Sequence, residues 1–493
     1  MRKRVIIIGG GASGLAAAVC CAREGAHAVV IEHMDRVGKK LLSTGNGRCN
    51  LTNQNMGPDC YRSEEPGFPM AVIRGFGVEE TLDFFRSLGV EPKSRNGYIY
   101  PNSDQAGAVL DALRQEIAHR GVQVLTGIHA LEIREASRNG EKGFAVVTDQ
   151  GEMEAGAVIL AAGSKAAPAT GSDGSGYELA RALGHGIIKP LPALVQLRCQ
   201  GRHYRELAGI RTEAMVRLFG DGELLAQDRG ELQLTDYGLS GIPIFQVSRF
   251  ASVALDERKR VEAQVDFLPA WSRRETVPLL KARRQQLAYR EGGEFLTGLL
   301  NKKLAQVLLK GAGIPLNGLS GQITDRQLEL LSRQIHCYEA LVMSVNPFAN
   351  AQVCRGGVDT RQVDPKTMES RICPGFYLCG EILDVDGICG GYNLQFAWSS
   401  GILAARSAAA RVRAMKGQDG EEEAGEDAAV PVPVQPPASA QRGGRTAGRA
   451  NPPSRRPKGQ SRPCPLGGRG MPERGHRVQN GPGKVYKSRR NKG

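Results

Sequence analysis

The sequence lacks the cysteine spacing that a structural zinc site requires. None of its 11 cysteines forms a Cys-x-x-Cys pair with a second such pair or with a histidine at zinc spacing. The adjacent residues Cys20 and Cys21 fall in a predicted helix, where they cannot form a normal disulfide. We therefore expect no bound metal, free thiols and a reducing, cytoplasmic compartment.

Long hydrophobic runs are also scarce, and the run near the start has its own explanation. The basic residues 2–4 precede an uncharged stretch, 5–22, which resembles a signal peptide or a short membrane span. That stretch contains four glycines, and its second half is rich in alanine rather than leucine. We therefore expect neither secretion nor membrane insertion.

The net charge of +14 is unevenly distributed along the chain. Residues 441–493 hold fifteen Lys or Arg against one acid, whereas 415–440 hold one Lys against six acids. We interpret 415–493 as a disordered, low-complexity basic tail, because its composition offers little apolar surface to bury. Two interpretations stay open: a solvated tail without a partner, or weak, salt-dependent contact with RNA or another anionic surface. Apart from Tyr486, no aromatic residue lies between the basic residues of this tail. This absence weighs against recognition of RNA by base stacking.

A dinucleotide-binding unit is predicted at the N-terminus. The apolar run 5–8 is typical of a strand buried on both faces, and Gly9-x-Gly11-x-x-Gly14 follows at once. A helix over 15–23 and a second strand over 28–31 come next, ending on Glu32. In such units the glycines admit a pyrophosphate at the helix start, and the acid accepts hydrogen bonds from a ribose. The predicted cofactor contacts are Gly9, Gly11, Ala12, Ser13, Gly14 and Glu32.

Two further glycine-rich regions can reach the same ligand. The loop 38–53 follows the second strand and offers backbone N–H groups and positive charges. Near residue 380 a strand ends on Gly-Glu, and a glycine pair then opens a helix over 396–411. That helix start suits the electron-rich edge of a flavin ring. The contacts predicted here are Lys39, Lys40, Gly45, Gly47, Arg48, Gly380, Glu381, Asp384, Gly390, Gly391, Asn393 and Leu394. A third element, an apolar strand that begins at residue 157 and ends on glycine, adds Gly163 to the predicted contacts.

Ordered motifs over residues 3–411 resemble the BaiN-type (YhiN-like) family of NAD(P)/FAD-dependent oxidoreductases. Besides the glycine motif, they include Gly47-Arg48-Cys49-Asn50, the stretches 171–177 and 235–241, and the block 380–395. The chain departs from the family at two places. Residues 161–164 are Ala-Ala-Gly-Ser, where the family often has Ala-Thr-Gly-Gly, and Cys354 follows Val353 where the family usually has Thr.

The resemblance implies an α/β fold: a Rossmann-like FAD-binding domain, interrupted by a β-barrel part and a small helical part. We expect the first part of the FAD domain over 1–189 and its second part over 341–414. The barrel-like insert is expected over 190–270, the helical insert over 271–340 and the tail over 415–493.

The same resemblance implies an FAD-dependent enzyme that uses NAD(P)H to reduce a conjugated C=C bond in a small, steroid-like substrate. Candidate catalytic residues are Arg48, Cys49, Tyr392 and Asn393. His185 is better explained as a structural histidine after a helix, and Tyr237 belongs either to a substrate lid or to a simple turn. No second Gly-x-Gly-x-x-Gly unit marks a nicotinamide domain, so the electron donor stays open.

Two alternatives remain open from the sequence. One is a flavoprotein that acts on RNA, as in tRNA modification, and the other is a flavin-binding regulator without turnover. The oligomeric state is left open as well.

Overall fold

A computed structural model describes residues 2–138 and 140–415. The predicted tail, 415–493, lies outside the described residues except for residue 415. Among the described residues, no helix is both long enough and apolar enough to cross a bilayer.

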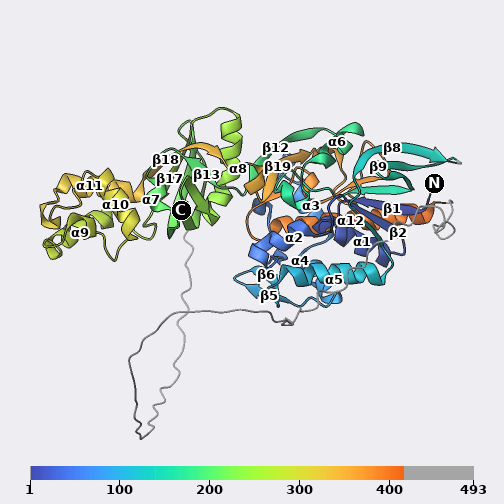
Figure 1. The fold of residues 1–493 in the computed structure, drawn as a ribbon, viewed down its shortest axis with the longest axis horizontal. Helices are drawn as coiled ribbons and strands as arrows, with labels where there is room; N and C mark the ends of the chain where they lie inside the picture. The colour runs from blue at the N-terminus through green and yellow to red at the C-terminus, as the bar shows by residue number, and fades with distance from the viewer. Residues whose placement is uncertain (1, 139, 416–493) are drawn as a thin grey trace, which may run out of the picture. The chain divides into compact units, whose positions relative to one another are not determined.

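The centre of the first domain is a five-stranded parallel sheet with the order β20-β11-β1-β2-β7. Its strands are short and apolar, and β1 is buried along its whole length. Strands that are apolar on both sides are typical of a parallel sheet whose two faces are both covered, as they are in this domain (Figure 1). The bounds are Arg4–Ile8 (β1), His27–Glu32 (β2), Gln123–Thr126 (β7), Ala157–Leu160 (β11) and Phe376–Leu378 (β20).

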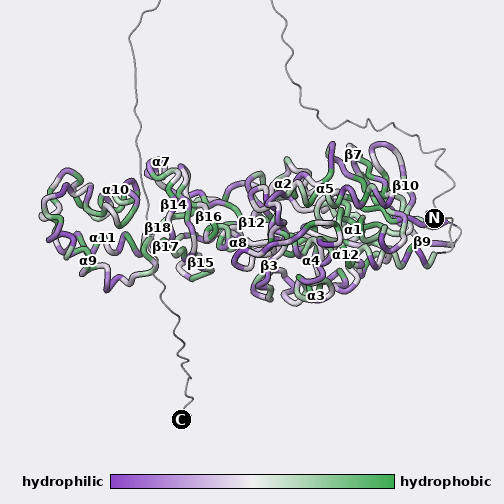
Figure 2. Tube along the Cα trace, turned by 90° about the horizontal axis from the view of Figure 1, so that it is seen from below, coloured by the Kyte–Doolittle hydropathy of each residue, from purple (hydrophilic) through white to green (hydrophobic). Residues whose placement is uncertain are grey.

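Helices α1 (Ala12–Arg23) and α12 (Tyr392–Ala414) pack closely against each other. A Cβ atom added to Gly401 would lie 2.4 Å from the backbone oxygen of Ser13, so the contact needs glycine. Figure 2 shows hydrophobic stretches mixed with hydrophilic ones in the region where these two helices are labelled. The contact joins the two halves of the first domain, which lie nearly 400 residues apart in the chain.

Smaller elements surround this sheet. The strand β7 joins the parallel sheet, whereas β8, β9 and β10 form a separate antiparallel sheet. These strands are Ala130–Arg138 (β8), Glu141–Thr148 (β9) and Gly151–Ala155 (β10). A second small sheet holds Thr52–Asn53 (β3), Pro92–Arg95 (β5) and Tyr98–Pro101 (β6), and Tyr61–Arg62 (β4) pairs with Asp386–Gly387 (β21). The helices here are Lys39–Ser43 (α2), Phe68–Gly75 (α3), Val78–Ser87 (α4), Ala106–His119 (α5) and Ser175–Ala182 (α6).

The insert contains a closed barrel with the strand order β13-β16-β15-β14-β17-β18. Its last strand, β18, crosses the predicted boundary at 340/341, so the helical part is inserted within the barrel. A two-stranded sheet, Ile187–Ala193 (β12) with Val353–Val358 (β19), connects the insert to the first domain. The barrel strands are Leu197–Cys199 (β13), Arg211–Gly220 (β14), Glu223–Thr235 (β15), Gly238–Gly241 (β16), Val261–Asp266 (β17) and Tyr338–Val345 (β18). The helices of the insert are Tyr204–Leu207 (α7), Ile242–Asp256 (α8), Arg273–Gln286 (α9), Lys302–Gly311 (α10) and Asp325–His336 (α11).

Candidate functional site

A cavity of about 630 Å³ lies at the carboxyl ends of the parallel strands. It is lined by the turn after β1, the end of β2, the loop around α2, the turn after β11 and the start of α12. Ligands of open α/β sheets bind at this edge. Fifteen predicted residues line the cavity: Gly9, Gly11, Ala12, Ser13, Glu32, Lys39, Lys40, Gly45, Arg48, Gly163, Glu381, Gly390, Gly391, Asn393 and Leu394.

The first turn of α1 faces the cavity with its backbone N–H groups. Gly11 is the N-cap residue, no side chain caps the helix, and the first turn carries no acid. The close turn before it needs glycine, because a Cβ on Gly14 would lie 1.9 Å from the Gly9 oxygen. The uncapped N–H groups and the helix dipole together favour an anionic ligand such as a pyrophosphate.

The Glu32 carboxylate is buried and held by two backbone donors. The N–H groups of Gly10 and Met34 each donate to it at 2.8 Å. The carboxylate keeps further acceptor capacity toward the cavity, as binding of ribose hydroxyls requires. His33 and His129 line the cavity beside it, with ring centroids 4.8 Å apart. No motif marked these two histidines, because His129 is brought there only by the folded chain.

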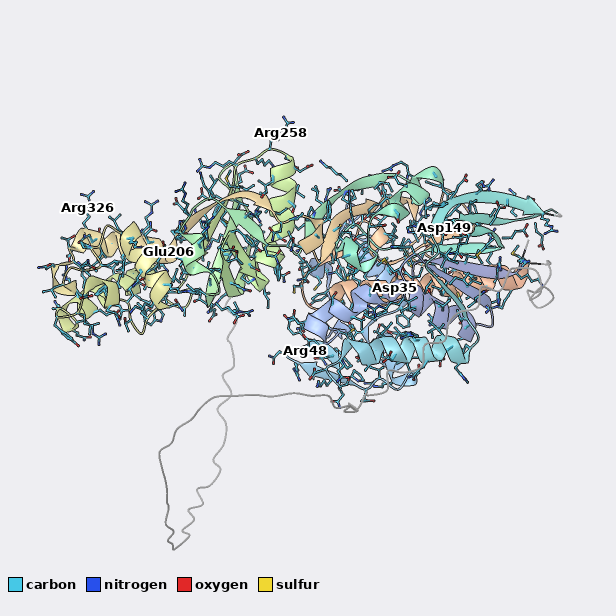
Figure 3. The ribbon with its side chains drawn as sticks, viewed as in Figure 1. Asp35, Arg48, Asp149, Glu206, Arg258 and Arg326 are labelled. Atoms are coloured by element: carbon cyan, nitrogen blue, oxygen red, sulfur yellow. The ribbon has the colours of Figure 1, made fainter. Side chains whose placement is uncertain are left out.

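An ion pair in the lining of the cavity joins the two halves of the domain. Lys40 of α2 donates to Glu381 at 2.5 Å, and the Ser164 hydroxyl donates to the same carboxylate oxygen at 3.1 Å. Lys39 pairs with Asp35. Arg48 is exposed, and its side chain projects from the margin of the ribbon (Figure 3).

The start of α12 forms a second uncapped helix terminus. Gly391 is the N-cap residue of α12 and has a φ of +96°. The Asn393 side chain donates to the Gly387 carbonyl at 2.9 Å and accepts from the Gly387 N–H at 2.8 Å. Asn50 lies against Gly391, and its buried side-chain oxygen has no hydrogen-bond partner among the described residues. An unpartnered acceptor beside free helix N–H groups fits the N–H and carbonyl edge of an isoalloxazine ring.

Six predicted residues do not line the cavity: Gly14, Gly47, Cys49, Gly380, Asp384 and Tyr392. Cys49 is fully buried, and burial raises the pKa of its thiol to about 12. The Tyr392 hydroxyl donates to the Asn55 carbonyl at 2.9 Å. Asp384 is fully buried and accepts from the Glu64 N–H at 2.7 Å, and burial raises the pKa of its carboxyl. The Gly380 N–H donates to Ser400. Gly14 lies inside α1 where a Cβ atom has no room, and Gly47 adopts a φ of +81°.

His185 and Tyr237 also lie outside the cavity lining. The His185 ring is buried between the Ala180 carbonyl (3.2 Å) and the Ser370 hydroxyl (2.9 Å), and Tyr237 occupies the turn between β15 and β16. Neither residue therefore contributes to the lining of this cavity.

The insert supplies an apolar wall that motifs did not reveal. Leu194, Ile242, Phe245 and Val353 line the cavity, and three of them, Leu194, Phe245 and Val353, pack together with Cys389. Helix α8 is anchored to the loop before α12, because Arg249 contacts the Asp386 carboxylate at 2.8 Å and Gln246 accepts from the Cys389 N–H at 2.9 Å. Tyr98 and Tyr100 of β6 add two phenol rings to the lining.

A Rossmann-type sheet, two free helix termini and an acceptor for a ring N–H define a flavin-dependent oxidoreductase. A family model described as "HI0933-like protein Rossmann domain" matches residues 3–407, and the chain belongs to this family.

Curated proteins extend this relationship over most of the chain. The chain is 46% identical over 411 residues to the "3-dehydro-bile acid delta(4,6)-reductase" of Clostridium scindens, covering 83% of this chain and 100% of that protein. It is 27% identical over 405 residues to the "Ribosomal RNA dihydrouridine synthase" of Haemophilus influenzae, covering 82% and 97%. A solved 3-ketosteroid delta1-dehydrogenase from Sterolibacterium denitrificans is 12% identical, with a TM-score of 0.43, covering 82% and 99%.

Proposed function

We propose that the protein uses NAD(P)H to reduce a C=C bond conjugated to a carbonyl group in a small, hydrophobic, steroid-like substrate. The observation that carries the proposal is the apolar wall of Leu194, Ile242, Phe245 and Val353, which lines the cavity and, Ile242 apart, packs on Cys389, just before α12. A fused-ring substrate buries apolar surface against such a wall. The similarity to the Clostridium scindens reductase supports the same reaction class.

The chain's own residues bind and orient the cofactor. FAD, when bound, supplies the two-electron transfer between the nicotinamide and the double bond. The first turn of α1 binds the pyrophosphate, Glu32 binds the adenosine ribose, and Lys40 with Glu381 fixes the middle of the cavity. The first turn of α12 and Asn50 hold the ring edge.

The four candidate catalytic residues have different proposed roles. Arg48 is exposed at the cavity mouth and attracts an anionic group of the substrate or of the nicotinamide donor. Asn393 positions the loop before α12 through its two bonds to Gly387. Cys49 and Tyr392 are positioning residues, because neither reaches the cavity.

The test is product analysis under anaerobic conditions. The purified protein with FAD is incubated with a 3-dehydro-Δ4,6 bile acid and either NADH or NADPH, and the product mass is determined. Gain of two hydrogens that depends on FAD and on one donor supports the proposal. Oxidation of the donor without change in the steroid would contradict it.

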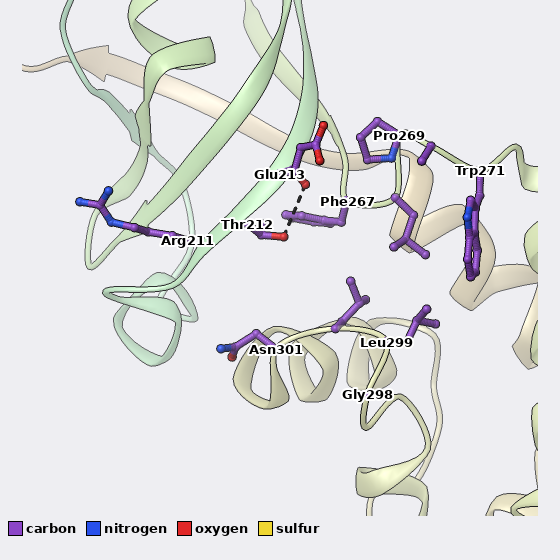
Figure 4. A pocket seen from close by; sticks show the side chains of 12 residues that line it. Arg211, Thr212, Glu213, Phe267, Pro269, Trp271, Gly298, Leu299 and Asn301 are labelled. Atoms are coloured by element: carbon purple, nitrogen blue, oxygen red, sulfur yellow. Dashed lines mark hydrogen bonds between the residues drawn. The ribbon is translucent and has the colours of Figure 1, made fainter. Parts of the chain in front are cut away.

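A second candidate is reduction of the uracil C5=C6 bond in RNA, which is also conjugated to a carbonyl. A charge asymmetry favours it: residues 271–337 hold eleven Lys or Arg against five acids, whereas the rest of residues 1–414 holds 38 against 39. Two aromatic side chains of this basic part are exposed, Trp271 (41%) and Tyr289 (71%). Phe267, Trp271 and Leu299 line a groove of about 460 Å³ beside it (Figure 4). Basic charge with exposed aromatics suits single-stranded RNA.

The two candidates are separated by one pair of charge variants. Arg273→Glu/Arg274→Glu removes positive charge beside Trp271, and Arg114→Glu on α5 is the surface control. If RNA is the substrate, the first variant weakens rRNA binding and flattens its salt dependence, and the control does not. If the steroid is the substrate, all three proteins reduce the enone equally and leave rRNA unmodified.

A further inference from the structure

We propose that Tyr98 is the catalytic acid that protonates the substrate carbon next to the carbonyl group; this inference rests on the proposed function. It holds for either substrate, because a steroid enone and a uracil ring both need a proton at the α-carbon after the β-carbon is reduced. Of the four candidate catalytic residues, Cys49 and Tyr392 do not line the cavity. Arg48 and Asn393 line it, but neither side chain is a suitable general acid.

The strand β6 directs Tyr98 into the cavity. Tyr98 pairs with Asn53 of β3, and side chains alternate along the strand. Ile99 is therefore buried on the opposite face, 3% exposed, while Tyr98 and Tyr100 line the cavity. Tyr98 is 36% exposed, so its hydroxyl can reach both a ligand and water.

Tyr98 lies at the flavin end of the cavity. A Cβ atom built on Gly390 would lie 2.8 Å from Cε1 of the Tyr98 ring, so the ring packs on the loop that opens α12. Asn53 fixes this loop by donating to the Gly390 carbonyl at 2.9 Å. Tyr100 instead lies near Gly45, with its Cε1 atom 3.5 Å from the Cβ position of that glycine.

Apart from Tyr100 and the Cys389 thiol, which also line the cavity, the other candidate acids are tied or lie elsewhere. The Tyr392 hydroxyl is engaged by Asn55, Lys40 is paired with Glu381, and His33 and His129 lie with Glu32 at the adenosine end. In the described ranges, no hydrogen bond occupies the Tyr98 hydroxyl. Burial raises the pKa of Tyr98, with smaller contributions from Cys389 and Asp228, which keeps the phenol protonated at neutral pH.

The step balances in atoms and electrons. The β-carbon gains a hydride that derives from NAD(P)H, and the π electrons of the double bond pass to the carbonyl as an enolate. The Tyr98 O–H bond breaks, and its proton forms the new C–H bond at the α-carbon. The tyrosinate then takes a proton from water at the cavity mouth.

The decisive variant is Tyr98→Phe, with Tyr100→Phe, which removes the neighbouring phenol from the same cavity lining, as the comparison. Both are tested as full-length protein with FAD, using a steroid 4-en-3-one in D₂O. We expect Tyr98→Phe to be reduced by NAD(P)H at the wild-type rate but to lose about 100-fold or more in its reoxidation by the enone. Its residual product should carry deuterium on both faces of the α-carbon, whereas the wild-type product carries it on one face.

A binding measurement separates catalysis from docking. Equilibrium dialysis of the saturated ketone against oxidised protein should give Kd values within about twofold for wild type and Tyr98→Phe, because the general acid acts in the transition state. Loss of ketone binding, unchanged reoxidation or retained one-face deuteration in Tyr98→Phe would each overturn the inference. Failure of the wild-type protein to react with the enone and with uracil RNA would instead overturn the proposed function, and the inference with it.

Discussion

Lys40 and Glu381 lie 341 residues apart in the chain, yet their side chains meet at 2.5 Å in the lining of the cavity. The pair links α2, from the first half of the domain, to the Gly-Glu turn of the second half. Both side chains are partly exposed, so the pair itself adds little to the stability of the fold. Its position in the lining suggests that it organises the cofactor site.

We therefore expect Lys40→Met to weaken FAD binding more than it weakens the fold. The variant leaves Glu381 without its cation, which places an unpaired carboxylate beside the cofactor. FAD affinity should fall about tenfold, whereas the melting temperature of the apoprotein should stay within a few degrees. Equilibrium dialysis and thermal unfolding measure the two quantities. Lys142→Met, on β9 away from the cavity lining, is the control.

Glu32→Gln should weaken FAD binding by a factor of about 10 to 100, because a charged acceptor of ribose hydroxyls contributes roughly 1.5–3 kcal/mol. The amide also brings an NH₂ group toward the N–H groups of Gly10 and Met34, which now donate to the carboxylate. The surface variant Glu79→Gln should bind FAD normally. Equal dissociation constants for the two variants would remove Glu32 from the site.

Gly401→Ala should destabilise the fold although alanine favours helices. The added Cβ meets the Ser13 backbone oxygen at 2.4 Å, which forces α12 away from α1. We expect a loss of about 1–3 kcal/mol in the free energy of unfolding, measured by urea denaturation. Gly107→Ala in α5, where an added Cβ meets nothing within 4 Å, should be neutral or slightly stabilising.

Asp386 should make stability fall as pH rises from 4 to 7. Burial raises the pKa of this carboxyl to about 6, against which Arg249 acts. The folded protein therefore holds the proton of this carboxyl more tightly than the unfolded chain does. The resulting stabilisation is complete at a pH below the unfolded pKa and is lost as pH rises through 6. The free energy of unfolding of wild type relative to Asp386→Asn should thus decline across that range, on the order of 2–3 kcal/mol. Because Asp384 also has a raised pKa, the comparison is repeated in Asp384→Asn.

The sequence was informative where spacing alone determines geometry. The turn after β1 and Glu32 lie where the glycine motif predicts them, because strand, turn and helix are local in the chain. The helix after Gly391 was predicted to begin at residue 396 but begins at Tyr392, since Asn393 and its bonds to Gly387 stabilise an earlier start.

Other parts of the site depend on tertiary contacts that no local pattern encodes. Tyr98 lies on a four-residue strand with little hydrophobic periodicity, and it reaches the cavity only through the pairing of β6 with β3. His129 meets His33 only because β2 and β7 are neighbours in the sheet. Cys49 sits in a glycine-rich loop that faces the cavity, but its own positive φ, +60°, accompanies a side chain buried in the core.

The most direct test of the central claim is an anaerobic titration of the purified, FAD-loaded protein with NADH and NADPH in separate cuvettes. We predict that the protein binds FAD stoichiometrically and that one of the two donors bleaches its visible absorbance, which an enone then restores. A protein that cannot be loaded with FAD, or a yellow protein that neither donor bleaches, would contradict the proposed NAD(P)H-driven reductase.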